Sequence, residues 1–421
     1  MLYDRWREMA RERREEIALH DLPSARQWTF RELDAAAQVR ETDAAVVFPR
    51  GNGAEFVFTV LRAWRHRQIV CPLEAGQLAP EFPLPPASVV HVKTTSATSG
   101  APKLIVFTAA QLAADADNIV ATMGLRPDWP NLAVISLAHS YGFSNLVMPL
   151  LLHGIPLVLG GTPLPETVRG AGEVLPALTL PAVPALWRVW NDAGAIPSST
   201  RLAISAGASL PVALEREIFQ RHGIKVHNFY GASECGGIAY DATETPRDDN
   251  ACVGAALANV VLNVNDAGCL EVRSLAVGER YWPEATPALA EGAYVTSDLA
   301  EIRAGSVRLH GRVNDVINVA GRKVSPETIE RLLSTHPAVR ECLVFGVPGA
   351  DVQRGDSIVA CLVTGSGVRG EELRQFLLAR TESWQVPREF WFVDSLAVNE
   401  RGKLSRAEWR ARFLHRGLLA S

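Results

Sequence analysis

The residues with the clearest chemical potential lie between Thr95 and Lys103, in the stretch TSATSGAPK. This stretch is rich in hydroxyl groups, contains a glycine and ends in a lysine, and it follows the mostly apolar run 88–92, which is typical of a strand. Backbone N–H groups and hydroxyls can surround phosphate oxygens, and a lysine adds positive charge. The spacing differs from the P-loop pattern, so this segment alone is compatible with a phosphate-binding loop or with a plain Ser/Thr-rich surface loop.

Six further segments place small and polar residues in a defined order along the chain. They are 139–143 (HSYGF), 205–210 (SAGASL), 228–234 (NFYGASE), 294–298 (YVTSD), 311–326 (GRVNDVINVAGRKVSP) and 401–406 (RGKLSR). With the 95–103 stretch, this order and spacing resembles the ATP-dependent carboxylate-adenylating superfamily. That superfamily comprises acyl- and aryl-CoA synthetases, the adenylation domains of peptide synthetases, and luciferases. The resemblance extends from about residue 28 to about residue 410.

The resemblance implies a reaction in two steps. A carboxylate is a poor electrophile, so ATP first converts it to an acyl adenylate with release of pyrophosphate, and a thiol then attacks the adenylate. Bringing a carboxylate to a polyanion requires lysines, an arginine, Mg²⁺ and oriented N–H groups. The expected cofactors are therefore ATP, Mg²⁺ and coenzyme A, or the phosphopantetheine of a carrier protein.

The resemblance assigns ATP binding to residues in most of these segments. Hydroxyls, glycine and lysine of the first stretch would enclose the β- and γ-phosphates, and Tyr230 would stack on adenine. Asp298, expected just after a short strand, would bind the ribose with Arg312. Ala97 and Leu104 stand where the family has glycine. The complete expected set is Thr95, Ser96, Thr98, Ser99, Gly100, Lys103, Gly207, Ala208, Asn228, Tyr230, Gly231, Ser233, Asp298, Arg312 and Lys323.

Three residues match catalytic positions of the family. Glu234 matches the magnesium ligand, since a hard cation prefers a carboxylate oxygen. Lys403 matches the lysine that bridges the attacking carboxylate and the α-phosphate. His139 matches a position beside the substrate carboxylate. The alternatives are a capped turn for Glu234, a solvated surface side chain for Lys403, and a strand-end histidine bonded to the backbone for His139.

The same resemblance implies two domains. The fold class is α/β: residues 1–314 would form a large domain of stacked mixed sheets with helices and a barrel-like part, and residues 315–421 a small α+β lid. Asn314 and Asp315 fall at the hinge between them, and Gly321 and Arg322 on the hairpin that lines the thiol channel. Residues ahead of the phosphate loop are fewer than in most family members, which indicates a shortened first subdomain with the deletion near 76–86.

Hydrophobic periodicity predicts the elements that hold these residues. Thr29 and Glu32 form a capping box at a helix start, and alternating strands and helices at 44–73 indicate a parallel βαβ unit. Segment 146–159 is too interrupted to cross a membrane and predicts a core helix followed by a buried strand. Further predicted strands are 132–137, 202–205, 225–229, 341–347, 357–363 and 389–393, antiparallel strands are expected over 252–273, and further predicted helices are 212–222, 326–335 and 371–381.

Composition restricts the class of protein. A chain of 421 residues with 48% hydrophobic and 21% charged residues is typical of a soluble globular enzyme with more than one domain. The net charge of −4 gives no basic excess for nucleic acid or for a membrane surface. Six scattered cysteines without a C-x-x-C pair predict buried free thiols in a reducing, cytoplasmic compartment. Residues 1–20 predict an amphipathic surface helix and no signal peptide.

We therefore interpret the chain as a carboxylate–thiol ligase that acts on a small carboxylic acid. Coenzyme A is the favoured thiol, and an acyl carrier protein is the alternative. A non-catalytic nucleotide-binding protein of the same fold is a second alternative, favoured by Ala97 and Leu104 and opposed by four retained charges: Glu234, Asp298, Arg312 and Lys403. Small residues at Gly231 and Ala232 favour an aryl or medium-chain acid, and the sequence gives no oligomeric state.

Overall fold

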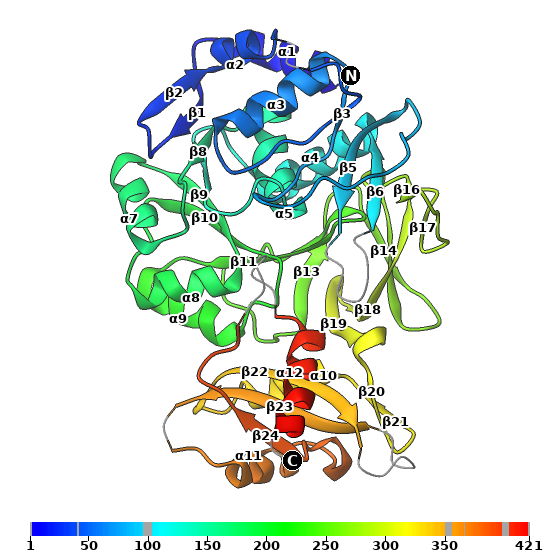
Figure 1. Ribbon diagram of the computed structural model, residues 1–421. Helices are drawn as coiled ribbons and strands as arrows, with labels where there is room; N and C mark the ends of the chain where they lie inside the picture. The colour runs from blue at the N-terminus through cyan, green and yellow to red at the C-terminus, as the bar shows by residue number, and fades with distance from the viewer. Residues whose placement is uncertain are drawn as a thin grey trace.

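The computed structural model describes residues 2–39, 42–95, 103–349, 356–365, 367–397 and 404–419. Figure 1 shows a large upper body built from the first part of the chain and a smaller unit below it that begins near β20 (Ile317–Val319). The predicted positions Ser96, Thr98, Ser99, Gly100 and Lys403 lie outside the described residues.

The largest sheet formed by the described residues has 14 strands. Its order is β14 (Val261–Val264), β15 (Cys269–Arg273), β18 (Ala293–Arg303), β19 (Ser306–Arg312), β13 (Cys252–Ala256), β12 (Gly236–Tyr240), β11 (Val226–Ala232), β10 (Thr200–Ser205), β9 (Leu178–Ala182), β7 (Asn131–Ala133), β8 (Leu157–Leu159), β1 (Ile17–Asp21) and β2 (Arg26–Thr29), with β17 (Leu289–Ala290) beside β18. Pairing is parallel from β11 through β10, β9, β7 and β8 to β1, and antiparallel from β11 through β12 to β14.

Helices connect and cover the parallel half, as parallel strands require crossover connections. Helices α7 (Pro165–Val174), α8 (Pro184–Asp192) and α9 (Val212–His222) lie on one flank in Figure 1, and Trp187 and Trp190 are fully buried in their cluster. The other helices of this body are α1 (Leu2–Glu12), α2 (Phe30–Ala36), α3 (Ala54–Arg65), α4 (Ala109–Met123), α5 (Ser140–Gly142), the π-helix η1 (Phe143–Val147) and α6 (Met148–His153).

A smaller mixed sheet carries the strands that flank the 95–103 stretch. Its order is β16 (Arg280–Trp282), β6 (Leu104–Thr108), β5 (Val89–Thr94), β4 (Ile69–Val70) and β3 (Val46–Val47). Strands β3, β4 and β5 are parallel, which confirms the predicted βαβ unit, whereas β5, β6 and β16 are antiparallel. The Thr29–Glu32 capping box is also confirmed, because each side chain accepts from the backbone N–H of the other.

The C-terminal unit is α+β, as predicted. It contains the hairpin β20 and β21 (Arg322–Val324), a three-stranded sheet of β22 (Val339–Pro348), β23 (Asp356–Thr364) and β24 (Glu389–Phe392), and helices α10 (Pro326–Leu333), α11 (Gly370–Leu378) and α12 (Arg406–Leu419). Apolar side chains of these elements form hydrophobic clusters of their own on the two faces of the sheet.

Two details correct the sequence-based expectations. Asp298 lies inside β18, which extends five residues beyond it, and does not follow a short strand; the hairpin with β19 prolongs the strand because Ala304 and Gly305 adopt positive φ and form a tight turn. The cysteines are free, but Cys252 and Cys342 are only half-buried because they lie at strand positions near the surface. The described helices include none that is both long and apolar enough to span a bilayer.

Candidate active site

Strand β11 is the element on which the site is built. On one edge it pairs in parallel with β10, and on the other it pairs antiparallel with β12. Its C-terminal end and the next two residues carry Tyr230, Gly231, Ser233 and Glu234. A Cβ atom on Gly231 would lie 2.6 Å from the carbonyl oxygen of Gly236, so the irregular β11–β12 pairing at this point requires glycine. Ligands of such sheets bind at the point where the strand arrangement changes.

Glu234 is held by two contacts from the segment that leads into β16. The Tyr281 hydroxyl donates a hydrogen bond of 2.9 Å to Oε1 of Glu234, and the Gly278 N–H donates one of 2.8 Å to its backbone carbonyl. Burial and the neighbouring Glu234 carboxylate raise the pKa of Tyr281, so its phenol remains a donor. The carboxylate therefore has a fixed orientation.

Tyr281 connects the Glu234 carboxylate to the 95–103 stretch, of which the structure describes the two end residues, Thr95 and Lys103. The Thr95 N–H donates to the Lys103 carbonyl at 2.8 Å, and the Lys103 N–H donates to Thr95 Oγ1 at 3.1 Å, which closes the base of the loop. The Lys103 ammonium lies 5.1 Å from the centre of the Tyr281 ring, within range of a cation–π interaction. Sequence reasoning did not identify Tyr281; its signal is the aromatic strand pattern Arg280-Tyr281-Trp282 before Pro283.

Tyr230, Asp298 and Arg312 form a second group on the antiparallel side. Asp298 and Arg312 are cross-strand partners on β18 and β19, and Arg312 Nε donates to Asp298 Oδ1 at 2.9 Å. The Tyr230 hydroxyl donates to Asp298 Oδ2 at 2.5 Å. Burial and the Asp298 charge raise the pKa of Tyr230, so this phenol also stays protonated. Asp298 and Arg312 thus lie in contact, as the expected ribose pair would, and Tyr230, which was expected to stack on adenine, also contacts Asp298. Their roles toward ATP stay predictions.

His139 and Ser140 reach the same strand end from the parallel side. His139 caps the short helix α5, and its ring nitrogen accepts from the Tyr141 N–H at 3.4 Å. The Ser140 hydroxyl donates to the Ser233 hydroxyl at 3.0 Å, which brings this segment next to Glu234. A Cβ on Gly142 would lie 1.9 Å from the Ser136 carbonyl oxygen, so the turn that presents His139 requires glycine. His139 therefore lies at the predicted site, and its ring is hydrogen-bonded to the backbone, as in the alternative interpretation of this residue.

The loop that follows β10 carries Gly207 and Ala208, both exposed to solvent, and Gly207 has φ +83°. The far end of this loop is fixed, because Arg247 Nη2 donates to the Leu210 carbonyl at 2.7 Å. Asn228 is buried in β11 beside Ser205 of β10. These residues border the same strand end as Tyr230, as the adenine assignment requires.

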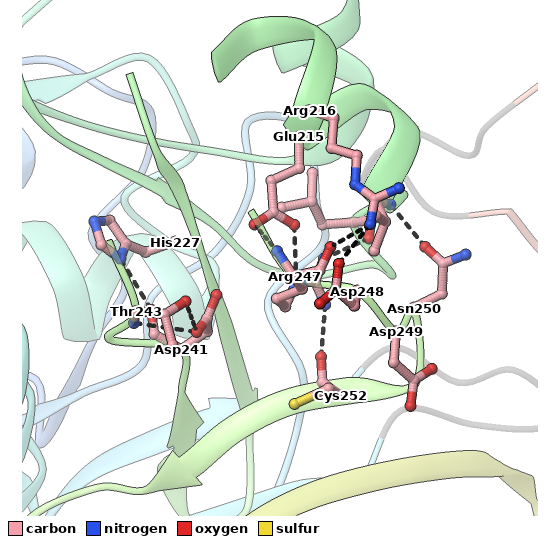
Figure 2. A network of polar contacts seen from close by, with 12 residues as sticks. Glu215, Arg216, His227, Asp241, Thr243, Arg247, Asp248, Asp249, Asn250 and Cys252 are labelled. Carbon is pink, nitrogen blue, oxygen red and sulfur yellow. Dashed lines mark hydrogen bonds and ion pairs between the residues drawn. The ribbon is translucent and has the colours of Figure 1, made fainter. Parts of the chain in front are cut away.

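A buried ionic network supports this loop and strand from behind (Figure 2). Glu215 of α9 accepts from Arg247 Nε at 2.8 Å and from Lys225, which also donates to Asp241 at 2.6 Å. Lys225 directly precedes β11 and Asp241 directly follows β12, so the network fixes both strands to α9. Burial acts to raise the pKa of Asp241, but hydrogen bonds from Lys225 and Thr243 lower it, so the carboxylate is ionised. Two positive and two negative charges offset each other in this cluster.

Lys93 is a further buried charge that sequence reasoning did not identify. It lies on β5, with its ammonium 4.6 Å from the centre of the Phe107 ring. Burial lowers the pKa of Lys93, and the neighbouring carboxylates of Asp115 and Glu234 oppose that effect. Asp115 itself accepts from Ser144 Oγ at 2.6 Å and from a β12 N–H at 3.0 Å. The available signal is a lysine inside an otherwise apolar strand.

The remaining predicted residues lie outside this cluster. Asn314 and Asp315 occupy the 3₁₀ turn η2 (Val313–Asp315), directly after Arg312. Gly321, Arg322 and Lys323 lie on the β20–β21 hairpin, as predicted, and the Arg322 guanidinium lies 5.5 Å from the centre of the Trp384 ring. Figure 1 places this hairpin at the outer edge of the C-terminal unit, so the structure does not bring Lys323 to the cluster around Glu234.

The arrangement of the acidic residues decides whether this site could bind Mg²⁺. Within the described ranges, no three His, Cys, Asp or Glu side chains converge as a metal-binding group. Glu234 therefore offers a single oriented carboxylate. That donor set suits Mg²⁺, which is commonly bound by one or two carboxylates together with substrate phosphates. The residues present fit a cation that binds together with a nucleotide.

Sequence comparison identifies the family. Residues 59–282 match the AMP-binding enzyme family, and residues 328–403 match the AMP-binding enzyme C-terminal domain. The chain belongs to the AMP-binding enzyme family. The first match contains β11, His139, Glu234 and Tyr281, whereas Asp298 and Arg312 lie between the two matched regions.

Curated relatives of this AMP-binding enzyme include two ligases of bacterial origin. It is 29% identical over 365 residues to a probable 2-succinylbenzoate–CoA ligase of Mycobacterium tuberculosis, covering 83% of this chain and 89% of the relative. It is 26% identical over 383 residues to a feruloyl-CoA synthase of an Amycolatopsis species, covering 83% and 77%. The enzyme thus resembles AMP-forming acid–CoA ligases over most of its length.

Solved structures show the same fold. ATP-bound MatB from Rhodopseudomonas palustris superposes with a TM-score of 0.86 at 19% identity, covering 98% of both chains. The amide bond synthetase McbA from Marinactinospora thermotolerans gives a TM-score of 0.84 at 22% identity, covering 98% of this enzyme and all of that chain. The predicted α/β fold of the adenylate-forming superfamily is therefore confirmed.

Proposed function

We propose that this AMP-binding enzyme activates an aromatic carboxylic acid as its acyl adenylate and transfers the acyl group to the thiol of coenzyme A. The observation that carries the proposal is the convergence of Tyr230, Ser233 and Glu234 at the end of one strand, each with a partner from a different segment. One side of this strand end suits the ribose and the other suits the acid and phosphates.

The chain's own groups divide the work of binding and orientation. Asp298, held by Arg312 and Tyr230, accepts hydrogen bonds from the ribose hydroxyls. Ser233 reaches the α-phosphate, and Lys103 brings positive charge to the β- and γ-phosphates at the base of its loop. Mg²⁺, when bound with ATP, neutralises charge that develops on the phosphates, and Glu234 is the residue that would hold it.

The second step requires a different arrangement of the C-terminal unit. We place the domain boundary between residues 314 and 315, with Asn314 and Asp315 as the hinge. In the first step Lys403 orients the carboxylate and the α-phosphate. Rotation about the hinge then removes Lys403 and brings the hairpin with Gly321 and Arg322 to the adenylate, where it lines the path of the thiol.

The acid is proposed from the shape of the strand end and from the relatives. The Ser140–Ser233 hydrogen bond holds the His139 segment beside the strand end, and the rings of Tyr141 and Phe229, which belong to these two segments, lie 6.0 Å apart. The two bacterial relatives above are named for aromatic acids, 2-succinylbenzoate and ferulate. A flat acyl group is the proposed substrate class.

A screen of carboxylic acids tests this function. Purified protein with ATP and Mg²⁺ is offered aryl, medium-chain and short dicarboxylic acids, with coenzyme A, with a phosphopantetheinylated carrier protein, or with neither thiol. Pyrophosphate release that depends on an aryl acid, and thioester formation that depends on coenzyme A, are expected. Glu234→Ala should abolish turnover while the protein stays folded. Acid-independent ATP hydrolysis, or no turnover with any acid, would contradict the proposal.

A further inference from the structure

Arg406 is the first residue of α12 and lies at the centre of a polar cluster in the C-terminal unit. Its Nη1 donates to Asp315 Oδ2 at 2.9 Å, and its Nη2 lies 2.8 Å from Glu327 Oε1 and 2.8 Å from Glu330 Oε2. Its Nε donates to the Val344 carbonyl at 3.1 Å. Every nitrogen of the guanidinium therefore has a hydrogen-bond or ion-pair partner, and none of these partners belongs to α12.

The partners connect separate parts of the molecule. Asp315 lies in η2, directly after the β19 strand of the large body, whereas Glu327 and Glu330 lie on α10. Glu330 Oε1 also accepts from the Val344 N–H at 2.8 Å, so α10, β22 and α12 share one set of hydrogen bonds. The cluster joins the turn between the two bodies to the start of the last helix.

The placement of Arg406 is costly without these partners. A positive charge at the first residue of a helix is opposed by the helix dipole. The side chain is also only 22% exposed. Three carboxylates offset both effects, and together with the guanidinium they give the cluster a formal charge of −2 when all are ionised. A planar guanidinium can meet three carboxylates and a carbonyl at once, which a lysine cannot do.

The chain just before Arg406 is fixed by the same helix start. Ser405 caps α12, because its hydroxyl accepts from the Glu408 N–H at 3.3 Å and its carbonyl accepts from the Trp409 N–H at 3.1 Å. Lys403 precedes Arg406 by three residues in the sequence. The cluster therefore fixes the position of Arg406, which is only three residues from Lys403 in the sequence.

We propose that Arg406 is a positioning residue for the adenylation step, which it serves by fixing the start of α12 to the hinge residue Asp315. The inference rests on the proposed function, in which Lys403 acts in the first step only. The link to Asp315 holds the start of α12, which comes shortly after Lys403 in the sequence, against the hinge. Loss of the link slows adenylation and leaves the thiol step, for which Lys403 is withdrawn, at its original rate.

Two variants test this inference in separate half-reactions. Asp315→Asn weakens the Arg406 link and leaves the Arg406–Glu330 and Arg406–Glu327 pairs in place; Arg406→Lys keeps the charge and loses the planar fork. Acid-dependent pyrophosphate release measures adenylation, and thioester formation from chemically supplied acyl-AMP measures the thiol step. Adenylation should slow about tenfold in Asp315→Asn, the loss typical of one charge-assisted hydrogen bond, and at least as much in Arg406→Lys. Thioester formation should stay within about twofold of the original rate in both variants, because Asp315→Asn replaces only a side chain and leaves the backbone that rotates at the hinge unchanged.

The matched control is Arg416→Lys on the same helix, where Arg416 pairs with Glu389 away from the hinge. Both half-reactions should keep their rates in that variant. If Arg406→Lys loses its fold, its melting temperature will show this, and Asp315→Asn remains the deciding variant. Unchanged adenylation in Asp315→Asn, or equal slowing of both steps, would overturn this inference and leave the proposed function standing. Absence of acid-dependent pyrophosphate release in the unmodified protein would overturn the proposed function, and the inference with it.

Discussion

Tyr281 donates a hydrogen bond of 2.9 Å to Oε1 of Glu234, although 47 residues separate the two in the chain. The same tyrosine ring lies under the Lys103 ammonium, so it touches both the proposed magnesium ligand and the end of the phosphate loop. This makes Tyr281 the contact through which β16 orients the proposed phosphate side of the site.

Tyr281→Phe removes the hydroxyl and keeps the ring. We expect the Mg²⁺ concentration that gives half-maximal pyrophosphate release to rise about tenfold, because a hydrogen bond to a charged carboxylate is worth roughly 1.5–3 kcal/mol. Titration of Mg²⁺ at saturating ATP and acid measures the effect. Tyr240→Phe, which alters another buried tyrosine of the same body, is the control and should leave the titration unchanged. An unaltered Mg²⁺ dependence in Tyr281→Phe would remove Tyr281 from the site.

The Asp298–Arg312 pair should govern ATP binding. Asp298→Asn removes the charge that Arg312 and Tyr230 hold in place, and we expect KM for ATP to rise at least about tenfold with KM for the acid unchanged. Steady-state kinetics with each substrate varied in turn measures the split. Asp249→Asn is the matched control, because Asp249 pairs with Arg308 of the same strand β19. Equal effects of the two variants would indicate damage to the strand and not loss of a nucleotide contact.

Lys403→Ala should separate the two half-reactions. If Lys403 bridges the carboxylate and the α-phosphate, acyl-AMP formation should fall by about two to three powers of ten, the cost of losing one oriented charge donor. Conversion of supplied acyl-AMP to thioester should persist. Single-turnover assays of each step provide the measurement, and a parallel loss in both would point to a lid that no longer folds or moves.

The buried ionic network behind β11 should be costly to break. Lys225→Met leaves Glu215 and Asp241 buried with one cation fewer, and we expect the free energy of unfolding to fall by about 3–5 kcal/mol. Arg216→Met is the control on α9, the helix that carries Glu215, since the Arg216–Asp248 pair is exposed and should contribute about 1 kcal/mol or less. Chemical denaturation of both variants measures the difference, and similar losses would show that the network adds no stability beyond a surface pair.

Glu330 gives the C-terminal unit a pH-dependent stability. Burial raises the pKa of Glu330 to about 7 even though Arg406 opposes the shift, while Glu327 adds to it. The folded protein therefore binds a proton that the unfolded chain releases between pH ~4.5 and ~7, so the free energy of unfolding falls as the pH rises through this window, by at most about 1.4 kcal/mol per pH unit. Above about pH 7 this contribution no longer changes.

Glu330→Gln isolates this effect, because a glutamine stays neutral at every pH. Hydrogen exchange of the α10 amides at pH 5, 6, 7 and 8 measures the unfolding of the variant and of the original protein. The stability of the variant relative to the original protein should increase as the pH rises. Arg406, Glu327 and the Val344 N–H also face this carboxyl and are unchanged in the variant. A difference that is constant with pH would mean that Glu330 is ionised throughout.

Local patterns predicted the local structure well. The Thr29–Glu32 capping box, the β20–β21 hairpin and the order of helices and strands in the C-terminal unit depend on residues close in sequence, and all are confirmed. The motifs also predicted that Asp298 and Arg312 would be partners, because their spacing resembles a known family, whereas the contact from Tyr230 to Asp298 was not predicted.

Contacts made by distant segments could not be predicted in the same way. Tyr281 reaches Glu234 only because β16 pairs with β6, and no local pattern encodes that pairing. Lys93 and the Lys225–Glu215–Arg247 cluster are ordinary charged residues in sequence, and their importance comes from burial alone. Arg406 was part of a recognised motif, but its four partners lie between 62 and 91 residues away along the chain.

Strand β11 has a parallel neighbour on one edge and an antiparallel neighbour on the other. The segments proposed to contact the acid belong to the parallel half, whereas Asp298 and Arg312 belong to the antiparallel half. Substitutions that reshape the acid pocket can therefore accumulate without disturbing the residues proposed to bind the ribose of ATP. A sheet divided in this way allows new acid specificities to evolve while the energy source of the reaction stays the same.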